Sequence, residues 1–221
     1  MSGCNGSAIT TVPESETDAA LSLFGDGLPL AQAYAQLLAQ VATVRGLLGP
    51  REVPRLWERH LLNCAGVAAL VPARCTLIDL GSGAGLPGLV LAIARPDLQV
   101  TLLDSMLRRT AFLHEAVAAL GLADRVRVVR ARAEEHRGRY DVVTARAAGP
   151  LPTVARWGAP LCQAGGLLLA IRGAQAGTEL AAAGPELAAA GWGEPRLTEC
   201  GSMLSTPTTV IRAARQGSVR R

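Results

Sequence analysis

The hydrophobic pattern of the chain changes near Cys75. Before this point, apolar residues recur at helical spacing over 30–48 and 56–67. The segment 1–28 is rich in Ser, Thr, Gly and acidic residues, shows no such periodicity, and predicts a mobile acidic tail. We therefore expect the tail to be followed by an N-terminal helical extension over 29–73.

Beyond Cys75, short apolar runs alternate with longer segments. Runs that predict strands are TLIDL (76–80), QVTLLD (99–104), RVRVV (125–129), YDVVTA (140–145) and GLLLAI (166–171). Helices are predicted near 88–95, 106–120, 151–161 and 178–190. This alternation is typical of an α/β fold with a mostly parallel sheet covered on both faces. RLTEC (196–200) and TTVIRAA (208–214) have only a loop between them, which predicts an antiparallel pair at the sheet edge.

Composition narrows the class of protein. A chain of 221 residues with 49% hydrophobic content is long enough to bury a large core as one domain. No apolar run approaches the roughly 20 residues of a membrane helix, and no secretory signal is evident, so we expect a cytoplasmic protein without a membrane partner. Five scattered cysteines and three isolated histidines predict neither a disulfide framework nor a metal site.

Charge is distributed unevenly. All 22 basic residues are Arg, and the formal net charge is +4 although residues 1–30 contain four acidic residues and no basic one. The body of the chain is therefore basic, which favours a polyanionic partner. Aromatic residues make up only 3% of the chain, which argues against recognition of single-stranded bases by stacking.

The stretch LIDLGSGAGLPG (77–88) carries the clearest chemical signal. An apolar strand ends in a glycine-rich turn that leads into a helix, and such a turn places a ligand at the carboxyl end of a parallel sheet. Gly81, Gly83 and Gly85 would let the backbone approach that ligand closely. An NAD fingerprint requires a third glycine where Leu86 stands, so the spacing fits S-adenosylmethionine better.

The second strand adds a carboxylate. Asp104 ends that strand and is placed to accept hydrogen bonds from a ribose diol, with Ser105 beside it as a further candidate for cofactor binding. Asp104 would equally cap the helix that begins near Met106, and the two roles are compatible.

These segments resemble the bacterial small-subunit ribosomal RNA guanine-N7 methyltransferases, also called the glucose-inhibited division protein B family. The matching segments run in order over 57–173 and are WERHLLN (57–63), LIDLGSGAGLPGLVLAIARPDLQVTLLDS (77–105), RRTAFL (108–113), ARAEE (131–135) and YDVVTARAAGPL (140–151). The resemblance implies a seven-stranded methyltransferase sheet (74–214) behind the helical extension, with a basic C-terminal tail over 215–221. It implies S-adenosylmethionine as cofactor and no metal.

The resemblance also implies site residues. Family contacts to the cofactor correspond to Gly81, Leu86, Ala133, Glu134 and Arg146. Asp79 is a candidate for the methionine ammonium group, directly or through water. The sequence departs from the common pattern at Asn63, Cys64, Arg172 (where Lys is usual) and the C-terminal hairpin MLSTPTT, and these changes concern RNA docking rather than methyl transfer.

The expected chemistry needs few groups. Guanine N7 is a bare lone pair, so its methylation requires no general base. The motif of amine methyltransferases is missing after the fourth strand, and Cys162 reads as buried packing rather than a nucleophile. Arg108, Arg132 and Arg146 are the favoured substrate-side residues, because a guanidinium binds phosphate or guanine O6. His60 reads as a satisfied core histidine.

The resemblance thus implies methyl transfer to N7 of a guanine in a functional loop of 16S ribosomal RNA, in naked RNA or in a partly assembled small subunit, by a monomer. Two alternatives stay open. One keeps the cofactor but takes a small-molecule or protein substrate. The other is a nucleotide-binding oxidoreductase or a non-catalytic regulator that has kept the fold.

Overall fold

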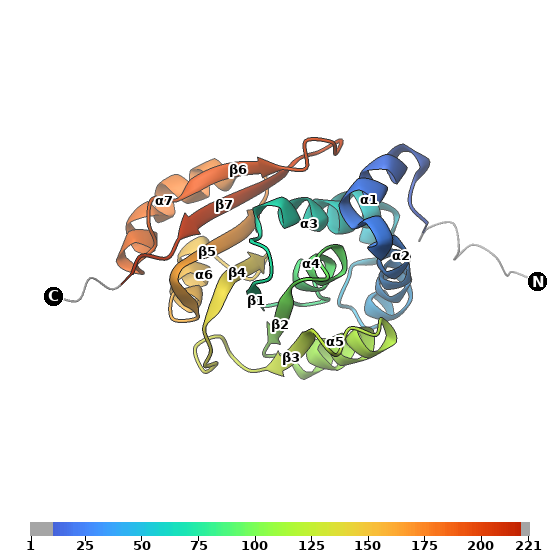
Figure 1. Ribbon diagram of the computed structural model, residues 1–221, viewed down its shortest axis with the longest axis horizontal. Helices are drawn as coiled ribbons and strands as arrows, with labels where there is room; N and C mark the ends of the chain where they lie inside the picture. The colour runs from blue at the N-terminus through green and yellow to red at the C-terminus, as the bar shows by residue number, and fades with distance from the viewer. Residues whose placement is uncertain (1–10, 218–221) are drawn as a thin grey trace, which may run out of the picture.

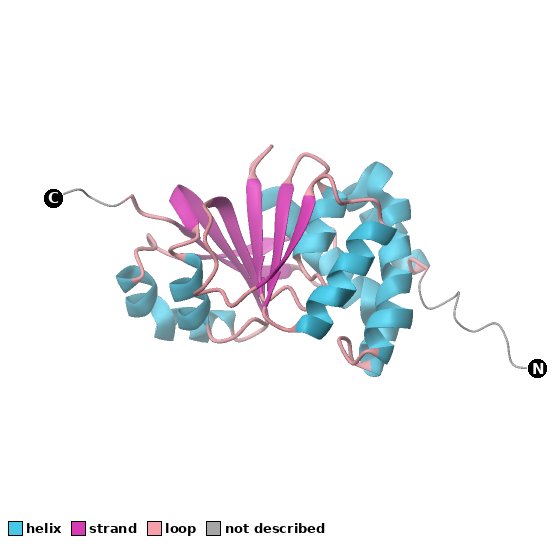
Figure 2. Cartoon of the chain, turned by 90° about the horizontal axis from the view of Figure 1, so that it is seen from below, coloured by secondary structure: helices cyan, strands magenta, loops and turns pink. Residues whose placement is uncertain are grey.

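The computed structural model describes residues 11–217 and contains one seven-stranded sheet with helices on both faces (Figures 1 and 2). The strands are β1 (Thr76–Leu80), β2 (Gln99–Asp104), β3 (Val126–Arg130), β4 (Tyr140–Arg146), β5 (Cys162–Arg172), β6 (Arg196–Cys200) and β7 (Thr208–Ala214). The helices are α1 (Thr17–Phe24), α2 (Leu28–Leu37), α3 (Asn63–Ala65), α4 (Gly88–Ala94), α5 (Leu107–Ala119), α6 (Leu151–Gly158) and α7 (Ala176–Ala189).

Short turns of tighter or wider helix complete the N-terminal region. The 3-10 segments are η1 (Glu14–Glu16), η2 (Gly25–Gly27), η4 (Pro50–Arg55) and η6 (Gly66–Leu70), and the π segments are η3 (Leu38–Ala42) and η5 (Trp57–Leu62). The two predicted amphipathic stretches therefore exist, and GPREVP (49–54) forms most of the break between them. Their helices are irregular because Pro54 lies inside η4 and the π segments widen the turns on either side of it.

The strand order is β3-β2-β1-β4-β5-β7-β6. Strands β1 to β5 pair in parallel, and β7 runs antiparallel to both of its neighbours. The predicted fold class and the antiparallel C-terminal pair are confirmed. Because parallel strands end at one edge, β1, β2, β4 and β5 bring Gly81, Ser105, Ala147 and Gly173 to the same side of the sheet.

Two hydrophobic layers hold the helices on the sheet. Alternate side chains of β1 divide between them: Leu77 joins the layer under α1–α5, whereas Ile78 joins the layer under α6 and α7. Both residues are fully buried. The order of strand and helix signals in the sequence thus translates directly into a three-layer arrangement.

The expectation of a mobile tail over 1–28 is wrong for residues 14–27, which form η1, α1 and η2; residues 1–10 lie outside the described range. Phe24 is buried and packs edge-on against Trp57, with ring centroids 6.3 Å apart. Burial of this short apolar face orders a segment whose composition is mostly polar. At the other end Arg215 is bound by carbonyls of Ala159 and Gly191, so the expected C-terminal tail is not free at its first residue.

Candidate functional site

The turn between β1 and α4 has the left-handed backbone that its glycines predict. Gly81, Gly83 and Gly85 have φ values of +65°, +59° and +99°. Gly81 lines a small cavity, and a Cβ there would lie 3.0 Å from the Ala148 Cβ. A Cβ on Gly85 would instead lie 2.7 Å from the Tyr34 hydroxyl. The backbone of Gly81 therefore faces a cavity, whereas Gly85 makes room for the protein's own helix α2.

Asp79 is a structural residue of this turn. It is fully buried, its carboxylate accepts hydrogen bonds from the Gly88 N–H (3.0 Å) and the Thr144 hydroxyl (3.2 Å), and burial raises its pKa to about 7. It does not line the small cavity beside Gly81. The carboxylate is already bonded inside the turn, so this geometry does not support a direct contact with the methionine ammonium, and the contact through water stays a prediction.

A cavity of about 210 Å³ opens where β1, β2 and β4 end. It gathers six of the predicted residues: Gly81, Asp104, Ser105, Arg132, Ala133 and Glu134. Gly83, Gly85 and Leu86 do not line it, because the turn directs them toward Asp104, Tyr34 and the apolar core. The sequence therefore found the strand-end residues of this cavity more reliably than those of the glycine turn.

Asp104 combines both roles that its position predicts. One carboxylate oxygen accepts the Met106 N–H at the start of α5 (2.9 Å), and the other accepts the Gly83 N–H (3.0 Å). The residue also lines the small cavity although it is only 3% exposed. A carboxylate has about four acceptor sites, so it can hold a ligand hydroxyl while it fixes the turn and the helix.

Arg109 and Trp157 complete the small cavity and were not predicted. The Trp157 indole N–H donates to Glu134 at 2.6 Å, and Arg109 lies 3.3 Å from Asp104. The sequence signal for Arg109 was its position beside Arg108 at the start of a helix. Arg108 itself is exposed and lines none of the cavities described here, so its expected role at the site is not supported by its position.

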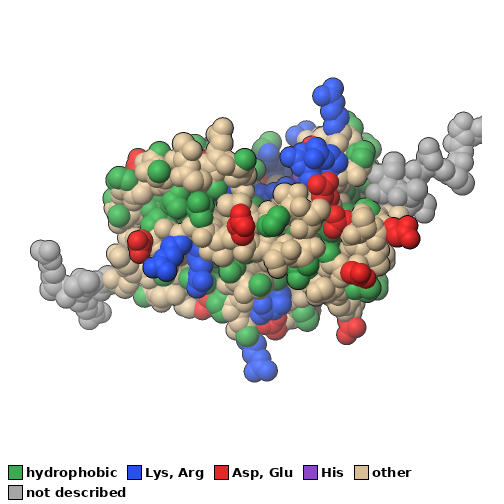
Figure 3. All heavy atoms as spheres, turned by 90° about the horizontal axis from the view of Figure 1, so that it is seen from above, with side chains coloured by type: hydrophobic (Ala, Val, Ile, Leu, Met, Phe, Trp, Pro, Cys, Tyr) green, Lys and Arg blue, Asp and Glu red, His purple; other side chains and the backbone are tan. Residues whose placement is uncertain are grey.

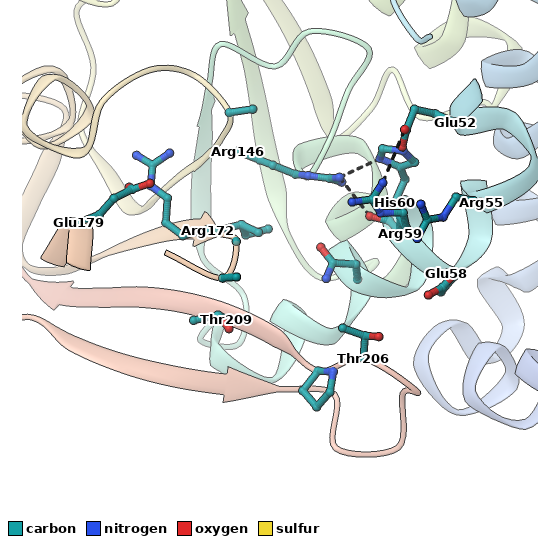
Figure 4. A pocket seen from close by; sticks show the side chains of 16 residues that line it. Glu52, Arg55, Glu58, Arg59, His60, Arg146, Arg172, Glu179, Thr206 and Thr209 are labelled. Atoms are coloured by element: carbon teal, nitrogen blue, oxygen red, sulfur yellow. Dashed lines mark hydrogen bonds and ion pairs between the residues drawn. The ribbon is translucent and has the colours of Figure 1, made fainter. Parts of the chain in front are cut away.

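A larger cavity of about 770 Å³ adjoins the first, and Figure 4 shows its lining side chains. Ala147 lines both cavities, which therefore meet just after the end of β4. Ala147 has φ +52°, a conformation that a non-glycine residue rarely adopts. Such backbone strain is common where a site fixes the chain, and it lies here at the junction of the two cavities.

Arg146 lines the larger cavity and is held by a buried histidine (Figure 4). Its guanidinium lies 2.8 Å from His60 Nδ1 and donates to the Arg59 carbonyl at 3.0 Å. Since a guanidinium only donates, Nδ1 accepts, and the His60 Nε2–H donates to Glu52 at 2.8 Å. His60 is thus a satisfied histidine, as expected, and it also orients a residue of the site.

The electrostatics of the larger cavity keep His60 neutral. Burial and the Arg146 charge lower the pKa of His60, although Glu52 opposes them. Arg55, Arg59, Arg146 and Arg172 also line this cavity, and Figure 3 shows basic side chains gathered around a hollow on one face of the molecule. Glu52, Glu58 and Glu179 line the cavity as well, so its four Arg side chains leave only a small excess of positive charge there.

Three other features of the chain bear on its chemistry: Cys162, metal ligands and membrane helices. Cys162 is buried, and burial raises the pKa of its thiol to about 12, which confirms it as packing. Within residues 11–217, no group of His, Cys, Asp and Glu side chains is arranged to hold a metal ion. No helix in the described part of the chain is long and apolar enough to cross a membrane.

Comparison with known proteins places this site in a family context. A family model described as rRNA small subunit methyltransferase G matches residues 28–203. A protein named ribosomal RNA small subunit methyltransferase G from Salinispora tropica is 53% identical over 220 residues, which cover 96% of this chain and 91% of the relative. The Thermobifida fusca protein of the same name is 61% identical over 166 residues, covering 74% and 70%.

Solved structures share the fold. The S-adenosylmethionine-dependent methyltransferase SibL in its apo form aligns with a TM-score of 0.61 and 19% identity, over 89% of this chain and 77% of that chain. At this identity the likeness concerns the fold alone.

Proposed function

The chain belongs to the rRNA small subunit methyltransferase G family, and we propose that it transfers a methyl group from S-adenosylmethionine to N7 of a guanine in 16S ribosomal RNA. The observation that carries the proposal is the pair of cavities that meet at Ala147, at the carboxyl edge of the parallel strands. The small cavity has the lining expected of a nucleoside site, and the larger cavity, at about 770 Å³, has the volume for a nucleotide.

The residues of the small cavity fit the cofactor. Gly81 presents bare backbone, Asp104 offers a buried carboxylate to a ribose diol, and Glu134 lies beside an aromatic ring, Trp157. We propose that Asp104 and Ser105 bind the ribose, and that Ala133 and Glu134 bind the adenine. When bound, this cofactor supplies an electrophilic methyl group on a sulfonium centre.

In the proposed reaction, the chain positions the cofactor and the guanine and excludes water from the reacting atoms. Guanine N7 carries a lone pair and no proton, so no residue has to remove one. Arg146, held by His60 at the larger cavity, and Arg132, an exposed side chain at the smaller cavity, present positive charge to the RNA. Positioning of two reactants at adjoining sites is the main source of rate in such a displacement.

The form of the RNA substrate, the oligomeric state and the compartment are part of the proposal. We infer that a partly assembled small subunit presents the target guanine, that the protein acts as a monomer, and that both meet in the cytoplasm where ribosomes form. Binding through Arg side chains to phosphate implies an affinity that falls steeply with salt.

The test is to incubate the protein with labelled S-adenosylmethionine and small subunits from a strain without this methylation, and then to map the label. We expect one N7-methylguanine in 16S RNA. Asp104→Asn should abolish transfer and weaken binding of S-adenosylhomocysteine, whereas Glu115→Ala, an exposed change on α5 at a residue paired with Arg45, should alter neither. Label on protein, on a small molecule or on another atom of the RNA would contradict the proposal.

A further inference from the structure

Arg172 is a buried cation whose bonding is incomplete. Its side chain is 6% exposed, and Nε and Nη2 form no hydrogen bond with any residue in the described range. Nε lies 3.2 Å from Glu179 Oε2, close enough for an ion pair but without hydrogen-bond geometry. A guanidinium stays charged even where burial disfavours it, so these nitrogens are donors that lack an acceptor.

The position of this pair is informative. Arg172 ends β5 and Glu179 lies in the first turn of α7, and both line the larger cavity. Arg146, at the end of the neighbouring strand β4, points toward His60, whereas Arg172 points toward Glu179 (Figure 4). The cavity therefore has Arg146, oriented by His60, on one side and the Arg172–Glu179 ion pair on the other.

Side by side, a guanidinium and a carboxylate match one base. The Watson–Crick edge of guanine presents the O6 acceptor next to the N1–H and N2 amino donors, whereas adenine presents a donor next to an acceptor in the opposite order. A donor beside an acceptor on the protein is thus complementary to guanine and mismatched to adenine. Both contacts leave guanine N7 free.

We propose that Arg172 and Glu179 recognise the Watson–Crick edge of the acceptor guanine, with Arg172 donating to O6 and Glu179 accepting from N1–H and the N2 amino group. This assignment rests on the proposed function, because it names the residues that select the base in the same reaction. Because Nε and Nη2 have almost no exposed surface, the donation to O6 requires the guanidinium to turn about its side-chain torsions into the larger cavity.

Inosine tests the assignment because it keeps O6, N7 and N1–H but lacks the N2 amino group. Methyl transfer is measured on small subunits assembled from 16S RNA with guanosine or inosine at the mapped position. For the wild-type protein we expect kcat/KM to be lower with inosine by about 10- to 100-fold, the effect of losing a hydrogen bond to a charged group.

The variants separate the two contacts. Glu179→Ala should slow transfer to guanosine and bring the guanosine-to-inosine ratio to within about 2-fold, since its acceptor for the amino group is gone. Arg172→Gln should slow transfer to both bases and keep the ratio, since both carry O6. Glu186→Ala, on the same helix but outside the larger cavity, is the matched control and should change neither.

Other outcomes overturn the assignment. An unchanged guanosine-to-inosine ratio in Glu179→Ala would contradict the assignment, because Glu179 would then not bind the N2 amino group. If Glu179→Ala does not fold, as judged by S-adenosylhomocysteine binding, the isosteric Glu179→Gln replaces it with the same expected direction. Failure of the wild-type protein to methylate either subunit would refute the proposed function instead, so the two failures are distinguishable.

Discussion

The hydrogen bonds of His60 at this site require its imidazole ring to be neutral. His60 accepts from Arg146 at Nδ1 and donates to Glu52 at Nε2, and a second ring proton would face the guanidinium. The neutral imidazole is therefore the form that holds Arg146 in the larger cavity.

This bonding predicts the pH dependence. Because the pKa of His60 is lowered from its ordinary value of 6.5, methyl transfer should persist at pH 6.5 and fall only below it, as the ring takes up a proton and releases Arg146. The free energy of unfolding should fall over the same pH range. The unfolded chain binds a proton at His60 more readily than the folded one, so lowering the pH below 6.5 reduces stability through this residue. Activity from about pH 5 to about pH 8, with NMR titration of the His60 ring, provides the measurement. An NMR midpoint above 6.5 would contradict it.

Trp157 offers an optical probe of the small cavity. Trp57 and Trp192 are 2% and 1% exposed, whereas Trp157 is less buried and lines the cavity. Addition of S-adenosylhomocysteine should therefore change the intrinsic fluorescence of the wild-type protein and leave that of Trp157→Phe nearly unchanged. A Trp157→Phe protein that keeps the full change while still binding would show that the reporter is a distant tryptophan.

At the scale of elements, the order of strands and helices could be predicted from the sequence, whereas the residues of the site could be predicted only in part. Each predicted strand from β1 to β7 exists within a few residues, because alternating apolar runs and amphipathic segments depend on local pattern. Asp104 was found because it ends a predicted strand, and Glu134 was implied by the family resemblance of ARAEE. Trp157 was missed because its place depends on how α6 packs, and η1, α1 and η2 were missed because long-range burial of Phe24 orders them.

The glycine turn packs against Tyr34 of helix α2. Alanine substitutions at Gly83 and Gly85 separate the effect of backbone strain from that of steric overlap with this side chain. At Gly85 the new Cβ would lie 2.7 Å from the Tyr34 hydroxyl at φ +99°, whereas at Gly83 the nearest contact is 3.8 Å at φ +59°. We expect Gly83→Ala to reduce the free energy of unfolding by about 1–2 kcal/mol from backbone strain, and Gly85→Ala to reduce it by more, about 3 kcal/mol or above.

Urea unfolding of both variants measures the difference. Tyr34→Phe should rescue part of the loss in Gly85→Ala, because it removes the colliding oxygen, and should rescue none of the loss in Gly83→Ala. Equal losses in the two alanine variants would show that packing against α2 contributes nothing.

For the whole molecule, the carboxyl of Asp79 links stability to pH. Its pKa is raised from 3.8 to about 7, so between these values the folded protein keeps a proton that the unfolded chain has lost. Stability from this residue is therefore full below pH 3.8 and falls as the pH rises toward 7, by up to about 4 kcal/mol for a shift of this size.

Asp79→Asn should remove this slope. The stability of the variant relative to wild type is expected to increase from about pH 4 to about pH 7, measured by urea unfolding at constant salt. A difference that does not vary with pH would show that Asp79 is ionised throughout this range in the folded protein.

The Tyr34 hydroxyl donates to the Ala84 carbonyl at 2.5 Å and occupies the space that a side chain at Gly85 would need. A chimera that took its first helices from a distant homologue would thus have to import the matching loop as well. The two pieces can be inherited or redesigned only as a set.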